Sequence, residues 1–247
     1  MKNNTYLWKW ACPLPNLTNG GYMFCGCDAL TSFSSNLSSL TNGGYMFCGC
    51  GLPSFTTDLP SLTNGGYMFY ECSNLTSFNA DLHSLVDCSF MFYKCTGLKI
   101  FSSDLSRLTD CFNMFSYCEN LTSFTTDLPS LVSGNNMFWD CKNLTTFSSK
   151  LGSLKSANAM FSGCKLNETS LRNIADNIND LKAKGYDKNN DEHWKYEVLG
   201  ETITINKYWR GHIDIDLDES VTQNVKNECG NKLIAKGWEV YFNDKFY

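Results

Sequence analysis

A Met-Phe pair recurs along the first two-thirds of this chain of 247 residues at a nearly constant interval. Successive pairs are separated by 23, 22, 23, 23, 23 and 23 residues. A fixed period of this length is typical of a solenoid, in which each repeat forms one coil. One coil is too short to bury its own apolar side chains, so the array must be stabilised by stacking. The pairs begin at Met23, Met46, Met68, Met91, Met114, Met137 and Met160.

A cysteine follows each Phe by three residues and serves to align the repeats. The unit is C-x-x-L-x-x-F-x-x-(D/N)-L-x-x-L-x-x-x-x-x-M-F-x-x, and residues 72–94 show it whole. The unit from Cys50 is one residue short, because Leu52 follows Cys50 by two positions instead of three. Near the N-terminus Asn4 takes the cysteine slot, so we expect no separate N-terminal cap. The seven units begin near residues 4, 27, 50, 72, 95, 118 and 141.

Three segments within each unit predict its path. A segment rich in Ser, Thr and Phe, such as TSF at 76–78, is typical of a short strand. The following Asp-Leu-Pro-Ser-Leu predicts a tight turn, with the carboxylate at its head and proline fixing φ. Asn-Gly-Gly-Tyr predicts a second turn that leads into the Met-Phe pair. Strands of neighbouring coils are therefore expected to form a parallel sheet along one wall.

The Leu, Phe and Cys slots at this period resemble those of BspA-type leucine-rich repeats, in which an apolar pair precedes the cysteine. The resemblance covers residues 4–166. The chain departs from it by carrying Met-Phe where the family more often has Val, Ile, Gly and Ala-Phe. The resemblance implies an α+β repeat protein, a leucine-rich-repeat solenoid with short parallel strands and a binding surface. Members of the family include surface adhesion proteins and phage or prophage structural proteins, so no single partner is implied.

Charged residues become denser near residue 165. Residues 1–164 contain 18 charged side chains and the remaining 83 residues contain 27. We therefore expect seven repeats over 1–164 and an α/β C-terminal capping unit over 165–247. In that unit the patterns first predict a helix, capped by Asn167 or Thr169 and ended by Gly185, and then a loop over 187–192. A hairpin of strands 202–206 and 212–218 is expected next. A second helix over 219–236, stopped by Gly237, and a final strand over 238–242 complete the unit.

Cysteine is abundant, with 13 residues, and seven of them occupy the same repeat slot. A cysteine tied to a repeat register usually serves as a small buried apolar side chain. The odd total and the lack of a secretory signal favour reduced thiols. Neighbouring coils lie about 4.8 Å apart in a stacked sheet, so oxidation to disulfides is open geometrically.

Two sets of aspartates raise the question of a cation site. Asp58, Asp81, Asp104 and Asp127 share one repeat slot, and either bind a cation or cap their own turns. Asn36 in the same slot favours turn capping. The second set, Asp214, Asp216 and Asp218, lies on one face of an expected strand, which we interpret as a solvated face because an EF-hand would need other residues at 219 and 225.

No catalytic, metal or cofactor motif is evident. The three histidines are scattered, and no nucleophile elbow or phosphate-binding glycine loop is present. We therefore expect a non-enzymatic protein without a cofactor. The net charge of −5 predicts no nucleic-acid partner.

Surface columns give the candidate binding residues. Tyr70, Tyr93 and Trp139 follow Met-Phe pairs, with Tyr117 one place over, and Ser77 and Thr125 represent a hydroxyl-rich strand face. The aromatic column either binds a partner or forms a half-buried ladder, and the hydroxyl face either binds a glycan or is simply soluble. We predict a non-enzymatic module that presents these faces to a protein or glycan at a surface.

The alternative prediction is a structural phage virion or fibre component that self-associates through its N-terminal end. Tyr6, Trp8 and Trp10 would form that assembly end. The chain has neither a signal peptide nor about 18 consecutive apolar residues, so we expect no membrane insertion. Its expected location is a virion or cell surface within a larger assembly, or otherwise the cytoplasm.

Overall fold

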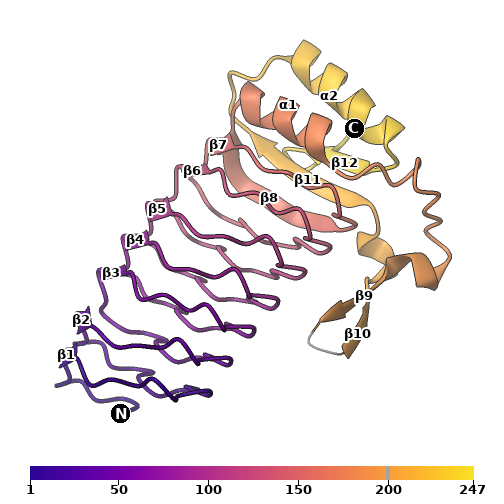
Figure 1. Cartoon of the computed structure of the whole chain (residues 1–247). Helices are drawn as coiled ribbons and strands as arrows, with labels where there is room; N and C mark the ends of the chain where they lie inside the picture. Colours follow the sequence, from indigo (N-terminus) through magenta and orange to yellow (C-terminus); the bar gives the residue numbers. More distant parts are fainter. Residues whose placement is uncertain (199–200) are drawn as a thin grey trace.

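The computed structural model describes residues 1–198 and 201–247 and shows a stack of coils that ends in a sheet and two helices (Figure 1). The helices are α1 (Glu168–Asn177) and α2 (Gln223–Ala235). The strands of the stack are β1 (Lys9–Trp10), β2 (Ser32–Phe33), β3 (Ser54–Phe55), β4 (Ser77–Phe78), β5 (Ile100–Phe101), β6 (Ser123–Phe124) and β7 (Thr146–Phe147). They are followed by β8 (Ala157–Leu166), β9 (Lys195–Val198), β10 (Glu201–Thr204), β11 (His212–Leu217), β12 (Glu239–Phe242) and β13 (Lys245–Phe246).

The strand of each coil pairs in parallel with that of a neighbouring coil. β1 pairs with β2, β4 pairs with both β3 and β5, and β6 pairs with β7, always in the repeat register, as in Phe55 opposite Phe78. This arrangement confirms the expected repeat protein with short parallel strands. A second column of parallel bridges runs along another wall of the stack through Asn19, Asn42, Asn64, Asp87, Asp110, Ser133 and Ser156.

Two ladders of phenylalanine rings fill the core. In the Met-Phe ladder neighbouring rings stack face to face, and Phe69 and Phe92 have centroids 5.5 Å apart at an interplanar angle of 2°. The strand ladder runs beside it, with Phe55 and Phe78 5.7 Å apart. Rings of the two ladders meet edge to face, as Phe78 and Phe92 do at 4.8 Å. Each such pair contributes about 0.5–1.5 kcal/mol beyond burial, so the repeat adds a similar increment with every coil.

The repeat cysteines are buried hydrogen-bond donors. Cys72 Sγ donates to the carbonyl oxygen of Phe47 at 3.0 Å, and Cys95 Sγ to that of Phe69 at 3.1 Å. Cys118 and Cys141 repeat this contact. Burial raises the pKa of these thiols well above the ordinary value. The predicted role as small buried side chains is confirmed, and all thirteen cysteines carry free thiols in the structure.

In the short coil, Gly51 precedes the core leucine. A Cβ at this position would lie 2.1 Å from the carbonyl oxygen of Asp28, which no side chain tolerates. Gly97, which precedes the core leucine of a full-length coil, makes a similar approach, 2.4 Å from the carbonyl oxygen of Ser73, so glycine in this slot marks a close contact between backbones and not the missing residue. Leu52 still reaches the core, where it is buried.

Aspartates cap the turns after the strands, but not all in the same way. The Oδ1 atoms of Asp81 and Asp104 accept the N–H group two residues ahead, at 3.0 and 2.8 Å. Asp58 and Asp127 have proline at that place, which has no N–H group. Their Oδ1 atoms instead accept the N–H groups of Asp81 and Lys150 in the next coil, both at 3.1 Å. Capping of their own turns is thus confirmed for Asp81 and Asp104 and is wrong for Asp58 and Asp127, because proline converts the cap within one coil into a bond between coils.

The helix predicted through Leu181 to Gly185 is shorter than expected. Asn167 caps α1 as predicted, with its Oδ1 accepting the N–H group of Ser170 at 2.9 Å, but α1 ends at Asn177. The next residues leave the helix because Ile178 forms a parallel bridge with Leu151, and the buried Asn179 donates to the carbonyl oxygen of Leu154 at 2.9 Å. Tertiary hydrogen bonds to the last coil therefore override the apolar spacing that predicted a longer helix.

The predicted hairpin of strands 202–206 and 212–218 is wrong. β10 pairs instead with β9, a strand that the sequence did not predict, and the expected loop over 187–192 runs into a short 3-10 turn at Asp191–Trp194. β11 lies between β8 and β12 and is parallel to both, and β13 completes the sheet order β13-β12-β11-β8. Figure 1 shows α1 and α2 on one side of this sheet and the β9–β10 arm projecting away from them. The second predicted helix is α2, which starts four residues later than expected.

At least three backbone hydrogen bonds per coil link the Met-Phe segments of the stack, and two of them come from residues with a positive φ. Tyr67, which precedes a Met-Phe pair, donates its backbone N–H group to a carbonyl oxygen of the next coil at 2.9 Å. Glu71, which precedes a cysteine, does the same at 2.8 Å. Both residues have a positive φ, of 59° and 57°, and the equivalent residues of the other coils share it. This left-handed backbone aims each N–H group along the axis of the stack, where only a further coil would normally supply an acceptor.

Two carboxylates take the place of that further coil where the repeats end. Asp214 Oδ2 accepts the N–H group of Ala159 at 2.6 Å, and Asp216 Oδ2 accepts that of Gly163 at 2.7 Å. Ala159 and Gly163 are the last residues of the two left-handed columns. β11 thus presents side-chain oxygens where the stack would otherwise present carbonyl oxygens.

This closure corrects the interpretation of the second aspartate set. Asp214 and Asp216 are half-buried hydrogen-bond acceptors and not a solvated face, and only Asp218 keeps to local capping, by accepting the N–H group of Ser220 at 2.9 Å. The residues that bond to them lie in β8, which continues across the boundary expected after residue 164. The division into repeats and capping unit stays a prediction, but its position falls inside a strand shared by both.

Candidate functional site

Four aromatic residues form a continuous row on the Met-Phe wall, which we call the outer aromatic row: Tyr70, Tyr93, Tyr117 and Trp139. Successive ring centroids are 5.1, 5.4 and 5.1 Å apart. Tyr70 and Tyr93 stack at 9°, whereas the next two steps are edge to face, at 79° and 61°. The structure therefore brings the four predicted aromatic residues together in one row.

Tyr117 enters the row from a different repeat position. Ser116 occupies the slot of Tyr93, but its side chain is buried and donates to the carbonyl oxygen of Asn136 at 2.6 Å. Tyr117 has the positive φ of its column, 61°, and this backbone turn places its ring between Tyr93 and Trp139. The row thus continues although its register slips by one residue.

Charged pairs accompany the row. Lys94 Nζ lies 3.3 Å from Glu71 Oε1, and Lys142 Nζ lies 2.8 Å from Glu119 Oε1, each pair joining adjacent coils. The hydrogen bond to Glu71 raises the pKa of Lys94, whose ammonium also lies 5.6 Å from the Tyr93 ring centroid. Such exposed pairs contribute little to stability, so their effect is a mixed-charge border to the aromatic surface.

A second set of rings, the inner aromatic row, comprises Tyr22, Tyr45, Tyr67 and Phe90. Their centroids are 4.6, 4.4 and 4.7 Å apart and their planes lie within 11° of parallel. These rings cover one another's faces, so the row presents ring edges and hydroxyl groups. Burial, together with the neighbouring phenols, raises the pKa of Tyr45 to about 12, so its hydroxyl stays protonated near neutral pH. The inner row matches the ladder interpretation of stacked aromatic columns.

The predicted hydroxyl residues belong to a different wall. Ser77 lies in β4 and is half-buried, while Thr125 is exposed just after β6. Thr125 lines a shallow hollow beside Asp104 and Asp127, which Ser77 does not share. Neither residue has a contact that joins it to the outer aromatic row.

The three residues predicted to form the assembly end do not share one exposed surface. Tyr6 and Trp8 are 90% and 65% exposed in the first coil. Trp10 instead packs into the core, with its ring edge-on to Phe24 at 5.1 Å and its Nε1 donating to the carbonyl oxygen of Cys12. Trp10 therefore fills the phenylalanine slot of the strand ladder.

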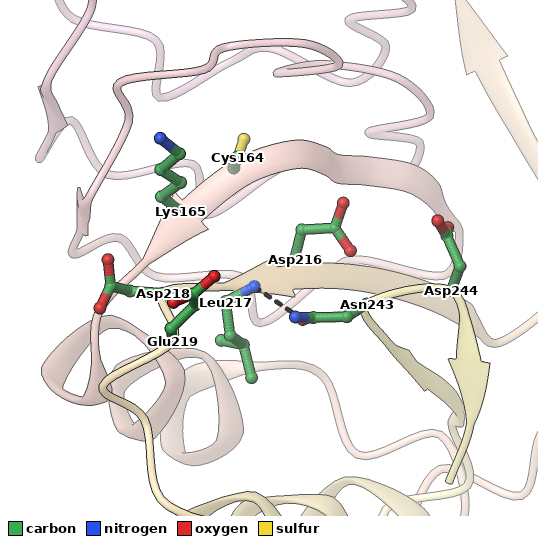
Figure 2. A pocket seen from close by; sticks show the side chains of 8 residues that line it. All are labelled: Cys164, Lys165, Asp216, Leu217, Asp218, Glu219, Asn243 and Asp244. Atoms are coloured by element: carbon green, nitrogen blue, oxygen red, sulfur yellow. Dashed lines mark hydrogen bonds between the residues drawn. The ribbon is translucent and has the colours of Figure 1, made fainter.

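An acidic pocket of about 590 Å³ lies at the edge of the C-terminal sheet (Figure 2). Cys164 and Lys165 of β8, the β11 end, and Asn243 and Asp244 of the β12–β13 turn line it. Two of its groups are committed to the fold: Asp216 accepts from β8, and Asn243 Oδ1 accepts the N–H group of Leu217 at 2.9 Å. Burial and the neighbouring acids raise the pKa of Asp216. No metal-binding cluster of His, Cys, Asp or Glu occurs here or elsewhere in residues 1–198 and 201–247.

Comparison with known families shows to which family the chain belongs. The model of the BspA type leucine-rich repeat region matches in six copies, over residues 15–106 and 88–189. The chain belongs to this family. No curated protein and no solved structure matches the chain.

Membership among the BspA-type leucine-rich repeats confirms the resemblance seen in the sequence and indicates a protein-interaction repeat module. Repeats of this family are typically non-catalytic. Within the described residues, no helix is both long and apolar enough to cross a membrane.

One surface of this BspA-type chain was missed by sequence reasoning. It is a groove beside the inner aromatic row, lined by the Asn-Gly-Gly-Tyr segments of three coils. The signal was the threefold recurrence of that tetrapeptide. We interpreted its Asn-Gly-Gly part only as turn chemistry, although the tyrosine column that follows was already a candidate surface. A turn needs an Asx residue at its head, but it does not need the same four residues in successive coils.

Proposed function

We propose that the chain is a non-enzymatic binding module whose outer aromatic row takes a protein partner at a surface. The observation that carries this proposal is the edge-to-face end of the row, where Tyr117 and Trp139 do not cover each other's faces and Trp139 is 37% exposed. Rigid aromatic side chains of this kind dominate protein hot spots, because they bury a large area at low cost in conformational entropy.

A glycan partner is the finer alternative. The ring geometry weighs against it only at the Tyr70–Tyr93 end of the row, because the edge-to-face rings of Tyr117 and Trp139 leave ring faces open to a sugar as well. Sugars stack on ring faces, but Tyr70 and Tyr93 stack on each other at 9°. The mixed-charge border of Glu71 with Lys94 complements a protein surface better than a neutral sugar. Ser77 and Thr125 then serve as a separate polar face on the strand wall.

The test compares capture from a surface-protein extract of the cells in which the chain occurs. The wild-type chain, the variant Tyr117→Ser/Trp139→Ser and the control Tyr208→Ser would be immobilised in parallel. Tyr208 is 85% exposed, lies in the segment after β10 and is not part of the row, so it controls for the loss of an exposed ring. The proposal requires at least one partner that the row variant loses and the control retains. Equal capture by all three chains contradicts it, and loss after enzymatic deglycosylation of the extract moves the proposal to a glycan.

A second candidate is a structural component that self-associates through the first coil, including a virion or fibre role. The exposure of Tyr6 and Trp8 supports it, since large exposed aromatic residues mark interaction sites. Light scattering distinguishes the candidates: a stable oligomer that Tyr6→Ser/Trp8→Ser converts to the 27.9 kDa monomer supports assembly, and a wild-type monomer contradicts it.

A further inference from the structure

Two cysteines of adjacent coils lie side by side on the Met-Phe wall. Cys25 and Cys48 directly follow the Met-Phe pairs of the first and second coils. The preceding rings, Phe24 and Phe47, stack with centroids 5.5 Å apart, and the N–H group of Gly26 donates to the carbonyl oxygen of Cys48 at 2.7 Å. Residues in register on neighbouring coils have Cα atoms about 5 Å apart, which is within the range of about 4.4–6.8 Å that a disulfide tolerates.

Both thiols are open to solvent on this wall. Each of the two cysteines is half-buried, and each is followed by a glycine. In the next two coils the residues at the glycine position are Glu71 and Lys94, whose side chains form an ion pair between coils. Because no such side chain stands beside Cys25 or Cys48, a small oxidant can reach their sulfur atoms.

The other cysteines lack a neighbour or lack access. The repeat cysteines also stack in register, but they are buried and donate their thiols to backbone carbonyl oxygens, as Cys72 does. Cys88 and Cys111 are adjacent and buried in the same way. Cys12 is exposed, but the equivalent residue of the next coil is Ser35, whose hydroxyl donates to the Cys12 carbonyl oxygen at 2.7 Å. Among the thirteen cysteines, all of which the structure describes, only the pair after the first two Met-Phe pairs is both adjacent and accessible.

A bond between the two sulfur atoms needs only a small movement of the first coil. The Cβ atoms of a disulfide lie about 3.8 Å apart, about 1 Å closer than equivalent groups of stacked coils. In this chain residues 1–3, and not a full coil, cover the outer side of the Cys25 segment, where the Asn3 N–H group donates to the Cys25 carbonyl oxygen at 2.7 Å. The first coil is therefore free to approach the second by this amount.

The step that joins the pair is thiol–disulfide exchange with a small disulfide such as oxidised glutathione. Burial, together with the neighbouring Cys25 thiol, raises the pKa of Cys48 to about 12, so Cys48 keeps its proton and Cys25 attacks first. Cys25 Sγ loses its proton, bonds to one sulfur of the small disulfide and releases the other as a thiol. Cys48 Sγ then gives up its proton, attacks Cys25 Sγ and releases the second thiol. Two protein thiols are oxidised, and one small disulfide is reduced to two thiols.

We propose that Cys25 and Cys48 are a redox-modified pair, which a small disulfide converts into a reversible cross-link between the first and second coils. A half-exposed disulfide stays within reach of a reductant, which makes the cross-link reversible. The pair occupies the slot that Tyr70 fills in the third coil, so the cross-link lies next to the outer aromatic row. The proposal does not depend on the function proposed for that row.

The test treats the whole, fully reduced native chain with oxidised glutathione and then blocks the remaining thiols with iodoacetamide in urea. Chymotrypsin cuts after aromatic residues and separates the two segments, and mass spectrometry of the unreduced digest identifies the linked peptides. Fragmentation of these peptides distinguishes Cys25 from Cys27 and Cys48 from Cys50. We expect the Cys25–Cys48 link to be the main product and an excess of reduced glutathione to remove it.

Amide exchange measures what the cross-link does to the stack. The N–H groups of Gly20 and Tyr22 donate to carbonyl oxygens of the second coil, at 2.9 and 3.0 Å. Because the cross-link holds the first coil against the second, we expect exchange at these two residues to be at least threefold slower in the oxidised chain than in the reduced chain.

The informative variant is Cys48→Ser, which the fold accepts because Ser116 and Ser162 occupy the same slot in later coils. We expect its Cys25 to carry at most a bound glutathione, and its first-coil exchange to be the same with and without oxidant. The matched control is Cys12→Ser, a change to the residue that Ser35 supplies in the next coil. We expect the control to form the cross-link as the wild type does.

Three results would overturn the proposal. The first is a wild-type chain in which Cys25 and Cys48 each carry a separate glutathione and are not linked. The second is a main link that joins other cysteines. The third is a Cys25–Cys48 link that leaves exchange at Gly20 and Tyr22 unchanged.

Discussion

At the residue scale, the aspartates show how a single neighbour changes the role of a side chain. The sequence correctly predicted that Asp58 and Asp127 accept backbone N–H groups. It did not predict that a proline two residues ahead removes the local donor and sends the bond to the next coil. The prolines are visible in the sequence, so the loss of the local donor could have been predicted. The new donor could not, because it lies in the next coil and its position is known only from the structure.

Replacing Asp127 measures the strength of such a bond. Asp127→Ala leaves the Lys150 N–H group without its acceptor, so we expect the free energy of unfolding to fall by about 1 kcal/mol. Asp127→Asn keeps Oδ1 and should cost clearly less. Urea denaturation followed by fluorescence measures both. Equal losses in the two variants would mean that the ion pair with Lys150, and not the backbone bond, matters.

The same residue has a defined pH dependence. Hydrogen bonds from the side chain and the backbone of Lys150 lower the pKa of Asp127. Its contribution is therefore present above the unfolded pKa of about 3.9 and is lost as the pH falls through the lower folded value. In the Asp127→Asn variant stability should decline less steeply below pH 4, and an unchanged acid profile contradicts this assignment.

The cysteines give a prediction about accessibility. Cys12 is exposed, Cys25 and Cys48 are half-buried, and burial raises the pKa of Cys48 to about 12. We expect iodoacetamide at pH 8 to label Cys12 in the native chain and to label Cys25 and Cys48 only slowly. The buried repeat cysteines should stay unmodified until urea unfolds the chain. Mass spectrometry of peptides measures the order. Fast native labelling of Cys72 or Cys95 would contradict their place in the core.

At the element scale, β11 closes the stack with two carboxylates. Asp214→Ala/Asp216→Ala removes the acceptors of the Ala159 and Gly163 N–H groups. Each lost acceptor leaves a backbone donor unpaired, which costs about 1–3 kcal/mol. We expect a lower urea midpoint and faster amide exchange at those two residues. Asp218→Ala, on the same strand but outside the closure, is the control and should leave exchange at Ala159 and Gly163 unchanged.

The C-terminal elements show which part of a fold is readable from local pattern. Both helices were predicted, together with the Asn167 cap, because helix spacing and capping are local properties. The strand pairing was wrong, because β11 joins β8 and β12 in parallel through partners that lie far away in sequence. β8 was missed entirely, since its sequence is that of a Met-Phe segment and becomes a strand only when β11 lies beside it.

At the scale of the whole molecule, the period fixes the architecture and the exceptions to the period mark the candidate surfaces. The stack, its core slots and its short coil all follow from the spacing of Met-Phe and Cys. The candidate surfaces do not, because they depend on where the repeat varies: Tyr117 replaces a ring from the neighbouring slot, and Ser89 takes the place of the glycines that line the groove in three coils. Such variation carries no pattern of its own in a single sequence.

The central claim is that the chain is a one-dimensional stack whose coils are stabilised by their neighbours and closed by β11 and α1. Amide hydrogen exchange of the whole native chain, followed by mass spectrometry, tests it most directly. The account predicts protection that is greatest in the coils next to β8 and falls steadily towards the first coil, which pairs on one side only in this chain. Uniform protection along the stack, or greatest protection in the first coil, would contradict it.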